Sequence, residues 1–215
     1  MSLHRIGLLC LSVGVLGGCM HKESTSEMSP ATTRPMPSDQ LDAAKHEMAP
    51  MMKKVAVAKI GPSNAATTQP TNNNVMGMVT FTEADGKMYI VADVTGLAPN
   101  SKHGIHIHDK GDLTAADLSS AGGHYDPGMI KHHGMPNEDM KLMSHAGDLG
   151  NLVADDKGVA HLELTVEDLT IDGAKNAIVG RSVIIHAKVD DLKTQPTGNS
   201  GGRVAGGVIE RTSQQ

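Results

Sequence analysis

Apolar and polar residues alternate in several short runs of this chain, and the alternation predicts β-strands. Residues 75–82 and 87–94 form two such runs, and the intervening Glu-Ala-Asp-Gly sequence indicates a hairpin turn. Further short strands are expected at residues 55–60, 104–111, 161–169, 177–189 and 203–210. No long segment has the periodicity of an amphipathic helix. The pattern therefore predicts an all-β barrel or sandwich in which long Gly- and Asp-rich loops separate the later strands.

The first residues of the chain have a different pattern, which is typical of an export signal. His4 and Arg5 precede an apolar run, residues 6–16, that is too short to span a bilayer. The run ends in Leu-Gly-Gly-Cys, which resembles a bacterial lipobox, whose cysteine is acylated and becomes the mature N-terminus. The alternative is an ordinary secretory signal in which Cys19 is incidental. We expect residues 1–18 to be a lipoprotein signal peptide and Cys19 to be the lipidation site.

The composition of residues 19–52 predicts a disordered tether, which connects this anchor to a folded domain at residues 53–215. The segment is rich in Ser, Thr, Pro and Glu and has no apolar periodicity. It also contains six methionines and two histidines, so a copper-gathering tail is an alternative to a plain linker. An acylated Cys19 would attach the protein to a membrane of the bacterial cell envelope, facing the periplasm. Because Met20 and not aspartate follows the cysteine, we expect the outer membrane.

Composition narrows the classes of function. The net charge of -5 argues against a general nucleic-acid binder, so no nucleic-acid partner is expected. Aromatic residues make up 1% of the chain, and the core must therefore come from aliphatic side chains and methionine. The two cysteines are Cys10, which leaves with the signal peptide, and Cys19. The folded domain is thus expected to have no disulfide.

Twelve histidines are the compositional outlier, and several are spaced to share a metal ion. His106 and His108 are two residues apart, so on a strand their side chains leave the same face. His103 is an odd number of residues away, and we expect it to point elsewhere as a structural, hydrogen-bonding histidine. His186 stands on an apolar strand, where a histidine is by default a core residue. It becomes a candidate ligand only through the company of the other histidines.

The loop after the His106 strand carries a second set of candidate ligands. It contains His124, the adjacent pair His132 and His133, and then His145 and Asp148. Three imidazoles and one carboxylate suit zinc, which accepts both ligand types in a tetrahedral site. The loop has little apolar content, so a bound ion could supply much of its ordering energy.

Six motifs in this order resemble the copper/zinc superoxide dismutase family, and the lipobox suggests a bacterial lipoprotein-type member. They are HGIHIHDKGD, SAGGHYDP, KHHG, HAGDLGN, AIVGRSVIIHAKVDDL and TGNSGGRVAGGVI, within about residues 55–211. The resemblance implies an eight-stranded antiparallel Greek-key β-barrel, of immunoglobulin-like sandwich architecture, with long metal-binding loops. It implies an oxidoreductase that disproportionates superoxide to dioxygen and hydrogen peroxide. Copper would cycle between Cu(II) and Cu(I), with a zinc-bridged histidine, one copper and one zinc per subunit, and a homodimer would fit.

The resemblance also implies a role for each candidate residue. The implied copper ligands are His106, His108, His124 and His186. The implied zinc ligands are His124, His132, His145 and Asp148, so that His124 bridges the two metals. Asp190 would orient His106 and His132, and Arg203 would bind the incoming anion. In the KHHG motif either His132 or His133 could ligate zinc, and counting from His124 favours His132.

Two features depart from the family. Its usual disulfide would join positions near Leu118 and Gly206, and neither is a cysteine here. Leu118 is therefore expected to pack where the bridge would lie. The segment at residues 191–203 is shorter than the charged loop that steers superoxide in many family members. The alternative function is copper binding or storage by the same fold without significant dismutase activity.

Overall fold

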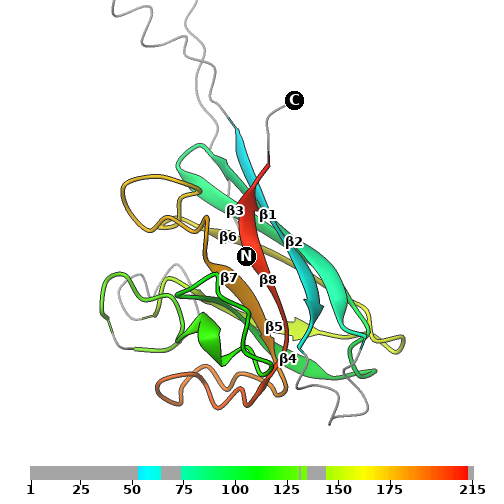
Figure 1. Ribbon diagram of the computed structural model, residues 1–215. Helices are drawn as coiled ribbons and strands as arrows, with labels where there is room; N and C mark the ends of the chain where they lie inside the picture. Colours follow the sequence, from blue (N-terminus) through cyan, green and yellow to red (C-terminus); the bar gives the residue numbers. More distant parts are fainter. Residues whose placement is uncertain (1–52, 64–73, 131, 135–143, 213–215) are drawn as a thin grey trace, which may run out of the picture. The chain divides into compact units, whose positions relative to one another are not determined.

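The computed structural model describes residues 53–63, 74–130, 132–134 and 144–212, which form eight antiparallel β-strands (Figure 1). The described residues fall within one compact unit, residues 49–215. None of them forms a helix long and apolar enough to cross a lipid bilayer. The strands are β1 (Lys54–Pro62), β2 (Met76–Ala84), β3 (Lys87–Thr95), β4 (Lys102–His108), β5 (Asp148–Val153), β6 (Ala160–Val166), β7 (Ser182–His186) and β8 (Arg203–Arg211).

The strands form one sheet in the order β5-β4-β7-β8-β1-β2-β3-β6. Its two outer strands, β5 and β6, contact each other, so the sheet curls into a nearly closed barrel. The chain crosses from one side of the sheet to the other between β3 and β4 and again between β6 and β7. This architecture agrees with the Greek-key barrel expected from the sequence, and the all-β prediction is confirmed. Because closure of a sheet removes exposed strand edges, this near closure leaves only β5 and β6 as outer strands, and they contact each other.

The predicted hairpin between β2 and β3 has a two-residue turn. Ala84 pairs with Lys87, which leaves Asp85 and Gly86 at the tip. Both tip residues have positive φ angles, 55° and 72° respectively. This is the conformation of a type I′ turn, whose twist matches that of the flanking strands and which favours Asp-Gly.

The barrel interior is filled by the aliphatic face of the alternating strands. On β3 the buried side chains are Met88, Ile90, Ala92 and Val94, at every second position. Phe81 of β2 is fully buried beside them, and the core otherwise consists of Val, Ile, Leu, Ala and Met with Tyr125. The expectation of an aliphatic core with little aromatic contribution is confirmed.

Strands β4 and β7 lie side by side and are buried on both faces. Ile105 and Ile107 of β4 point into the barrel. His106 and His108, which alternate with them, point to the opposite face. Long loops after β4 and β7 lie against that outer side (Figure 1). The polar outer face of these two strands is therefore enclosed, which is the condition for a buried polar site.

Strand β5 was not among the strands expected from alternation. Its sequence, Asp-Leu-Gly-Asn-Leu-Val, mixes polar and small residues and follows directly on a His-Ala-Gly turn. Asp148, the first residue of β5, is 1% exposed, so a carboxylate occupies a buried strand position. A local pattern rule cannot recognise such a strand, because the partners that make the carboxylate tolerable come from distant loops.

Candidate metal centre

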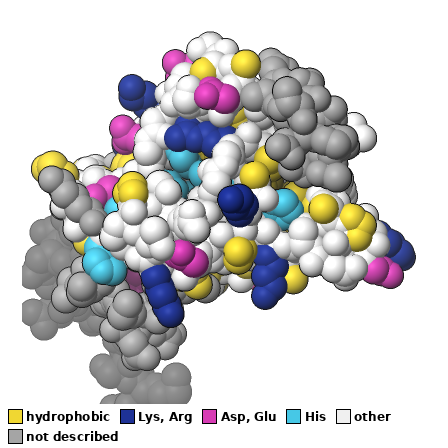
Figure 2. Space-filling view, turned by 90° about the horizontal axis from the view of Figure 1, so that it is seen from below, with side chains coloured by type: hydrophobic (Ala, Val, Ile, Leu, Met, Phe, Trp, Pro, Cys, Tyr) yellow, Lys and Arg dark blue, Asp and Glu magenta, His cyan; other side chains and the backbone are white. Residues whose placement is uncertain are grey.

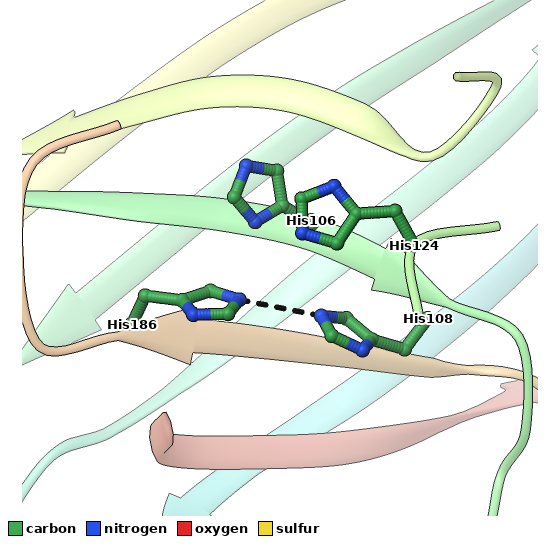
Figure 3. A group of neighbouring side chains, drawn as sticks. All are labelled: His106, His108, His124 and His186. Atoms are coloured by element: carbon green, nitrogen blue, oxygen red, sulfur yellow. Dashed lines mark hydrogen bonds between the residues drawn. The ribbon is translucent and has the colours of Figure 1, made fainter. Parts of the chain in front are cut away.

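Four histidines from three parts of the chain face one another on the outer side of β4 and β7 (Figure 3). His106 and His108 project from the same face of β4, as their spacing predicts, and His186 ends β7. His124 comes from the loop after β4 and pairs with His108 through an isolated bridge. One ring nitrogen from each of the four lies within 4.8 Å of the others, and all four residues are buried.

The ring nitrogens of His108 and His186 show which atoms are free to bind a ligand. Nδ1 of His108 lies 3.0 Å from the Gly122 carbonyl oxygen, and Nδ1 of His186 lies 3.2 Å from that of Gly201. A carbonyl oxygen only accepts hydrogen bonds, so in a neutral ring each Nδ1 carries the proton and each Nε2 keeps a lone pair. Yet the two Nε2 atoms lie 3.3 Å apart, the contact dashed in Figure 3. A shared cation would satisfy both lone pairs.

His106 and His124 complete the cluster with nitrogens that have no partner. Nε2 of His106 donates to Asp190 Oδ2 at 2.7 Å, and Nδ1 of His124 lies 2.8 Å from Asp148 Oδ1. The remaining nitrogens, Nδ1 of His106 and Nε2 of His124, are buried without a hydrogen-bond partner in the described structure. Buried polar atoms are rarely left unpaired. The four inward nitrogens therefore have the chemistry of a metal site, and imidazole suits copper.

A second group of possible ligands surrounds the carboxylate of Asp148. Nδ1 of His124 is 2.8 Å, Nδ1 of His145 is 3.3 Å and Nδ1 of His133 is 3.0 Å from its oxygens. One ligand atom from each of His106, His124, His133 and Asp148 lies within 4.8 Å of the others. His124 belongs to both groups and has one nitrogen toward each. Three imidazoles and a carboxylate fit zinc, and the shared ring would bridge two ions.

His133, and not His132, lies against the carboxylates of the second group. Nε2 of His133 lies 2.8 Å from Asp190 Oδ1, and its Nδ1 faces Asp148. His132 is in neither group of potential ligands found among the described residues. The loop's path, and not a count of residues from His124, decides which ring reaches the carboxylates.

Asp190 connects the two groups, with His133 in the place expected for His132. Its Oδ2 accepts from His106 and its Oδ1 lies beside His133 Nε2. Asn151 of β5 holds the Asp190 backbone, since its Oδ1 accepts from Asp190 N at 2.8 Å and its Nδ2 donates to Asp190 O at 2.9 Å. Gly198, with φ of 63°, leaves space for the carboxylate, because a Cβ there would overlap it. The sequence offered no signal for these two supports, since both depend on tertiary contacts.

Burial keeps the imidazoles of the first group neutral. It lowers the pKa of His124 to about 4 and that of His186 to about 3, and it lowers the pKa values of His106 and His108 as well. Metal ions bind the neutral imidazole, so these rings need not lose a proton at neutral pH.

In the second group, hydrogen bonds outweigh burial in setting the pKa values. Burial by itself would lower the pKa of His133, but hydrogen bonds to Asp148 and Asp190 prevail and raise it to about 9. Burial opposes ionisation of the two carboxyl groups, but hydrogen bonds from the histidines hold the pKa of both well below the usual range. Without metal, the second group is therefore held together by a protonated His133 between two carboxylates.

Arg203, at the start of β8, lies close to the first group. Its guanidinium donates to the carbonyl oxygens of Leu118 and Gly122. The Gly122 oxygen also accepts from His108, so one carbonyl joins the arginine to that histidine. The arginine is half-buried, and burial lowers its pKa. A fixed cation beside the histidine cluster is suited to attracting a small anion.

Leu118 packs where the absent disulfide would lie. Its side chain is 6% exposed and clusters with Ala121 and Ile184. A Cβ built on Gly206 would lie 3.2 Å from Leu118 Cδ1 and 2.8 Å from Ile184 Cδ1, so the leucine fills the space against β8. The expected packing is confirmed, and the same residue presents its carbonyl oxygen to Arg203.

His103 has the structural role expected of it. Its Nδ1 donates to the backbone oxygen of His186 at 2.7 Å, and its Nε2 lies 2.7 Å from Ser101 Oγ. Both nitrogens are thus engaged within the barrel, and the ring belongs to neither group of potential ligands. It supports His186 through the main chain.

Comparisons with known proteins agree with this geometry. A model of the family described as copper/zinc superoxide dismutase (SODC) matches residues 75–209. A Drosophila melanogaster protein named extracellular superoxide dismutase [Cu-Zn] is 40% identical over 158 residues, which cover 70% of this chain and 81% of that protein. Its namesake from Brugia pahangi is 37% identical over 153 residues, which cover 67% and 73%. The crystal structure of the clock protein EA4 aligns with a TM-score of 0.61 and 36% identity, over 74% of this chain and 94% of that one.

Proposed function

This chain belongs to the copper/zinc superoxide dismutase family, and we propose that it disproportionates superoxide to dioxygen and hydrogen peroxide. The observation that carries the proposal is the buried cluster of four imidazoles, in which the inward nitrogens of His106 and His124 have no hydrogen-bond partner in the described structure and those of His108 and His186 face each other. Arg203 adjoins the cluster through the carbonyl oxygen that it shares with His108. The family binds copper and zinc, and the donor set fits both metals.

We assign the ligands from the free nitrogens. Copper would be held by His106 through Nδ1, by His124 through Nε2, and by His108 and His186 through Nε2. Zinc would be held by Asp148 and by the three rings that face it, those of His124, His133 and His145. The second set replaces His132, expected from the sequence, by His133. Asp190 orients His106 and His133 by accepting from the Nε2 atoms that point away from the metals.

Bound copper would supply the one-electron oxidation of one superoxide and reduction of a second, and zinc would fix and polarise the shared imidazole. Two superoxide anions and two protons yield one dioxygen and one hydrogen peroxide. His124 Nε2 is the atom at which the chain can hold one of those protons, since its Nδ1 is directed at Asp148.

Arg203 binds and orients the anion. Its hydrogen bonds to Leu118 and Gly122 hold the guanidinium in place without neutralising its charge. Figure 2 shows basic side chains dispersed among acidic ones on the face seen from below, and not gathered in one patch. The attraction of superoxide then depends on the local cation more than on a broad positive surface. Copper storage, the alternative, leaves a fixed arginine at this position without a purpose.

The test is a superoxide assay on the full chain loaded with copper and zinc, beside His124→Ala. We expect the loaded wild type to accelerate superoxide decay, and His124→Ala to lose activity and bind both metals more weakly. Wild type that binds both metals but leaves superoxide decay at the rate of buffer would contradict the proposal. In that case storage of copper becomes the better account.

We further propose an extracytoplasmic location, which the names of the two extracellular relatives support. The finer assignment is a lipoprotein anchored through Cys19 in the outer membrane of a bacterial cell envelope, facing the periplasm. It rests on the Leu-Gly-Gly-Cys sequence, and residues 1–52 lie outside the described residues. Mass spectrometry of the mature protein from membranes tests it: an acylated N-terminal Cys19 supports the anchor, and an unmodified one contradicts it. Assembly as a homodimer remains a prediction for light scattering.

A further inference from the structure

The side-chain amide of Gln195 binds both backbone polar groups of His133. Its Oε1 accepts from His133 N at 2.7 Å, and its Nε2 donates to His133 O at 3.1 Å. Nε2 also donates to Lys193 O at 3.1 Å, so both amide hydrogens and the amide oxygen are engaged. A reciprocal pair of this kind fixes the position and the rotation of the residue it holds.

The loop that carries Gln195 is itself held by internal hydrogen bonds. Oδ1 of Asp191 accepts from the backbone N atoms of Lys193 and Thr194 at 3.0 and 2.8 Å. Gly198 N donates to Thr194 O at 2.7 Å, and Asp191 N donates to Gly198 O at 2.8 Å. Asp191 therefore fixes the conformation of this loop. Gln195 reaches His133 from a base with a defined conformation.

Position matters at this point because two histidines are adjacent. In an extended segment, consecutive side chains point in opposite directions. A slip of one residue would therefore bring His132 toward the carboxylates and turn His133 away. The ring of His133 contacts Asp148 and Asp190, and the only other described hydrogen bonds of His133 are those from its backbone to Gln195. The Gln195 amide holds the backbone at this position. It therefore determines which of the two adjacent histidines faces the carboxylates.

We infer that Gln195 is a positioning residue that selects His133 over His132 as the zinc ligand and thereby sets the affinity for zinc. The inference rests on the ligand set proposed above. It goes beyond that set because it assigns the choice of ligand to a residue that contacts neither metal position. Residues that support a ligand in this way typically change metal affinity by about 10-fold to 100-fold when they are replaced.

The experiment measures zinc binding by metal-free full chain in competition with a chelator, and the absorption spectrum with Co²⁺ in place of zinc. We compare Gln195→Ala with Gln195→Glu, which keeps the acceptor for His133 N and loses the donor. Gln195→Ala should weaken zinc binding about 10-fold and shift the Co²⁺ bands, and Gln195→Glu should fall between. Copper affinity should stay within about twofold, because the only hydrogen-bond partners of the Gln195 amide among the described residues, His133 and Lys193, are not proposed copper ligands. Thr197→Ala, in the same loop, is the matched control and should bind zinc like wild type.

The register is tested by adding His132→Ala. In the wild-type background this change should leave zinc affinity unaltered. In Gln195→Ala it should weaken zinc binding further, because His132 then serves as an alternative zinc ligand in part of the molecules. A Gln195→Ala protein with wild-type zinc affinity and Co²⁺ spectrum would overturn the inference. If His133→Ala binds zinc as tightly as wild type, the proposed ligand set fails instead, and the inference with it. Circular dichroism of each metal-free variant separates loss of the site from loss of the fold.

Discussion

His106 and His133 donate to the two oxygens of a single carboxylate, that of Asp190, at 2.7 and 2.8 Å. The two histidines belong to different proposed metal sites, so one side chain orients a ligand of each. Because Asn151 holds the Asp190 backbone from β5, the carboxylate is anchored to the barrel and not only to its loop. Asp190 therefore links the two proposed metal sites, in addition to the link through His124, which belongs to both groups of potential ligands.

The first prediction concerns this connection. Asp190→Ala should weaken both metals, by about 10-fold to 100-fold, because both rings lose the acceptor that fixes their orientation. Asp190→Asn should affect one metal more than the other, since an amide offers only one acceptor oxygen. Chelator competition for copper and for zinc gives the two affinities separately. Asp172→Asn, which breaks a surface pair with Lys54, is the control and should change neither affinity.

The second prediction concerns Arg203. Arg203→Met should lower the rate constant for superoxide by about 10-fold or more at low ionic strength, since the local cation is lost. Copper and zinc contents should be unchanged, because the arginine binds carbonyl oxygens and no ligand ring. Stopped-flow rates at several salt concentrations measure both effects. A variant with a wild-type rate and the same salt dependence would exclude Arg203 from anion binding.

The third prediction concerns the apolar substitute for the disulfide. Leu118→Ala should lower the free energy of unfolding by about 2–3 kcal/mol, because it leaves a cavity against Ile184 and Gly206. It should also lower activity, since the Leu118 carbonyl oxygen binds Arg203. Denaturant unfolding and the superoxide assay measure the two losses. Val153→Ala, at a side chain that is 56% exposed, should cost less than about 0.5 kcal/mol.

A related outcome separates leucine packing from disulfide chemistry. The chain has no cysteine after Cys19, so a thiol reductant should leave the melting temperature of the metal-free protein unchanged. A marked drop on reduction would show that a covalent bond involving Cys10 or Cys19 contributes to the stability of the barrel.

The fourth prediction concerns acid. Folding holds the pKa of His124 at about 4 and that of His186 at about 3, whereas unfolded histidine titrates near 6.5. As pH falls below about 6.5 the unfolded chain takes up protons that these rings refuse, so the metal-free protein loses stability. Each ring contributes about 1.4 kcal/mol per pH unit in that window. His133, whose pKa is raised to about 9, acts oppositely, but its contribution is complete below pH of about 6.5.

Denaturant unfolding of metal-free protein between pH of about 7 and 4.5 measures this slope. His186→Leu should reduce the slope by the share of one histidine. His161→Leu is the control, because Asp93 and Glu163 raise the pKa of that exposed ring. Below the unfolded pKa, His161 is protonated in both the folded and the unfolded chain, so it does not contribute to the slope. Stability that does not change over this range would contradict the burial of neutral histidines.

Much of the barrel was predictable because the alternation of β3 is a local property of its sequence. The Asp-Gly turn after β2 was equally readable, since its two positive φ angles favour those residues. Strand β5 was missed because it begins with Asp148, a polar residue that a pattern of alternation places outside, whereas in the structure it is buried. The histidine rings and the backbone N–H groups of Gly134 and His145, which converge on its carboxylate, make that burial possible.

The sequence by itself determined that His106 and His108 share a face, since the two-residue period of a strand requires it. With the order of its motifs, it also indicated a bridging role for His124. Only the tertiary structure decided that the ring of His133, and not that of His132, faces Asp148 and Asp190. The contacts that decide come from Asp190 and Gln195, about sixty residues further along the chain, and a count of neighbouring residues contains no information about them. Spacing specifies which side chains can meet on one element, whereas folding specifies which distant groups they meet.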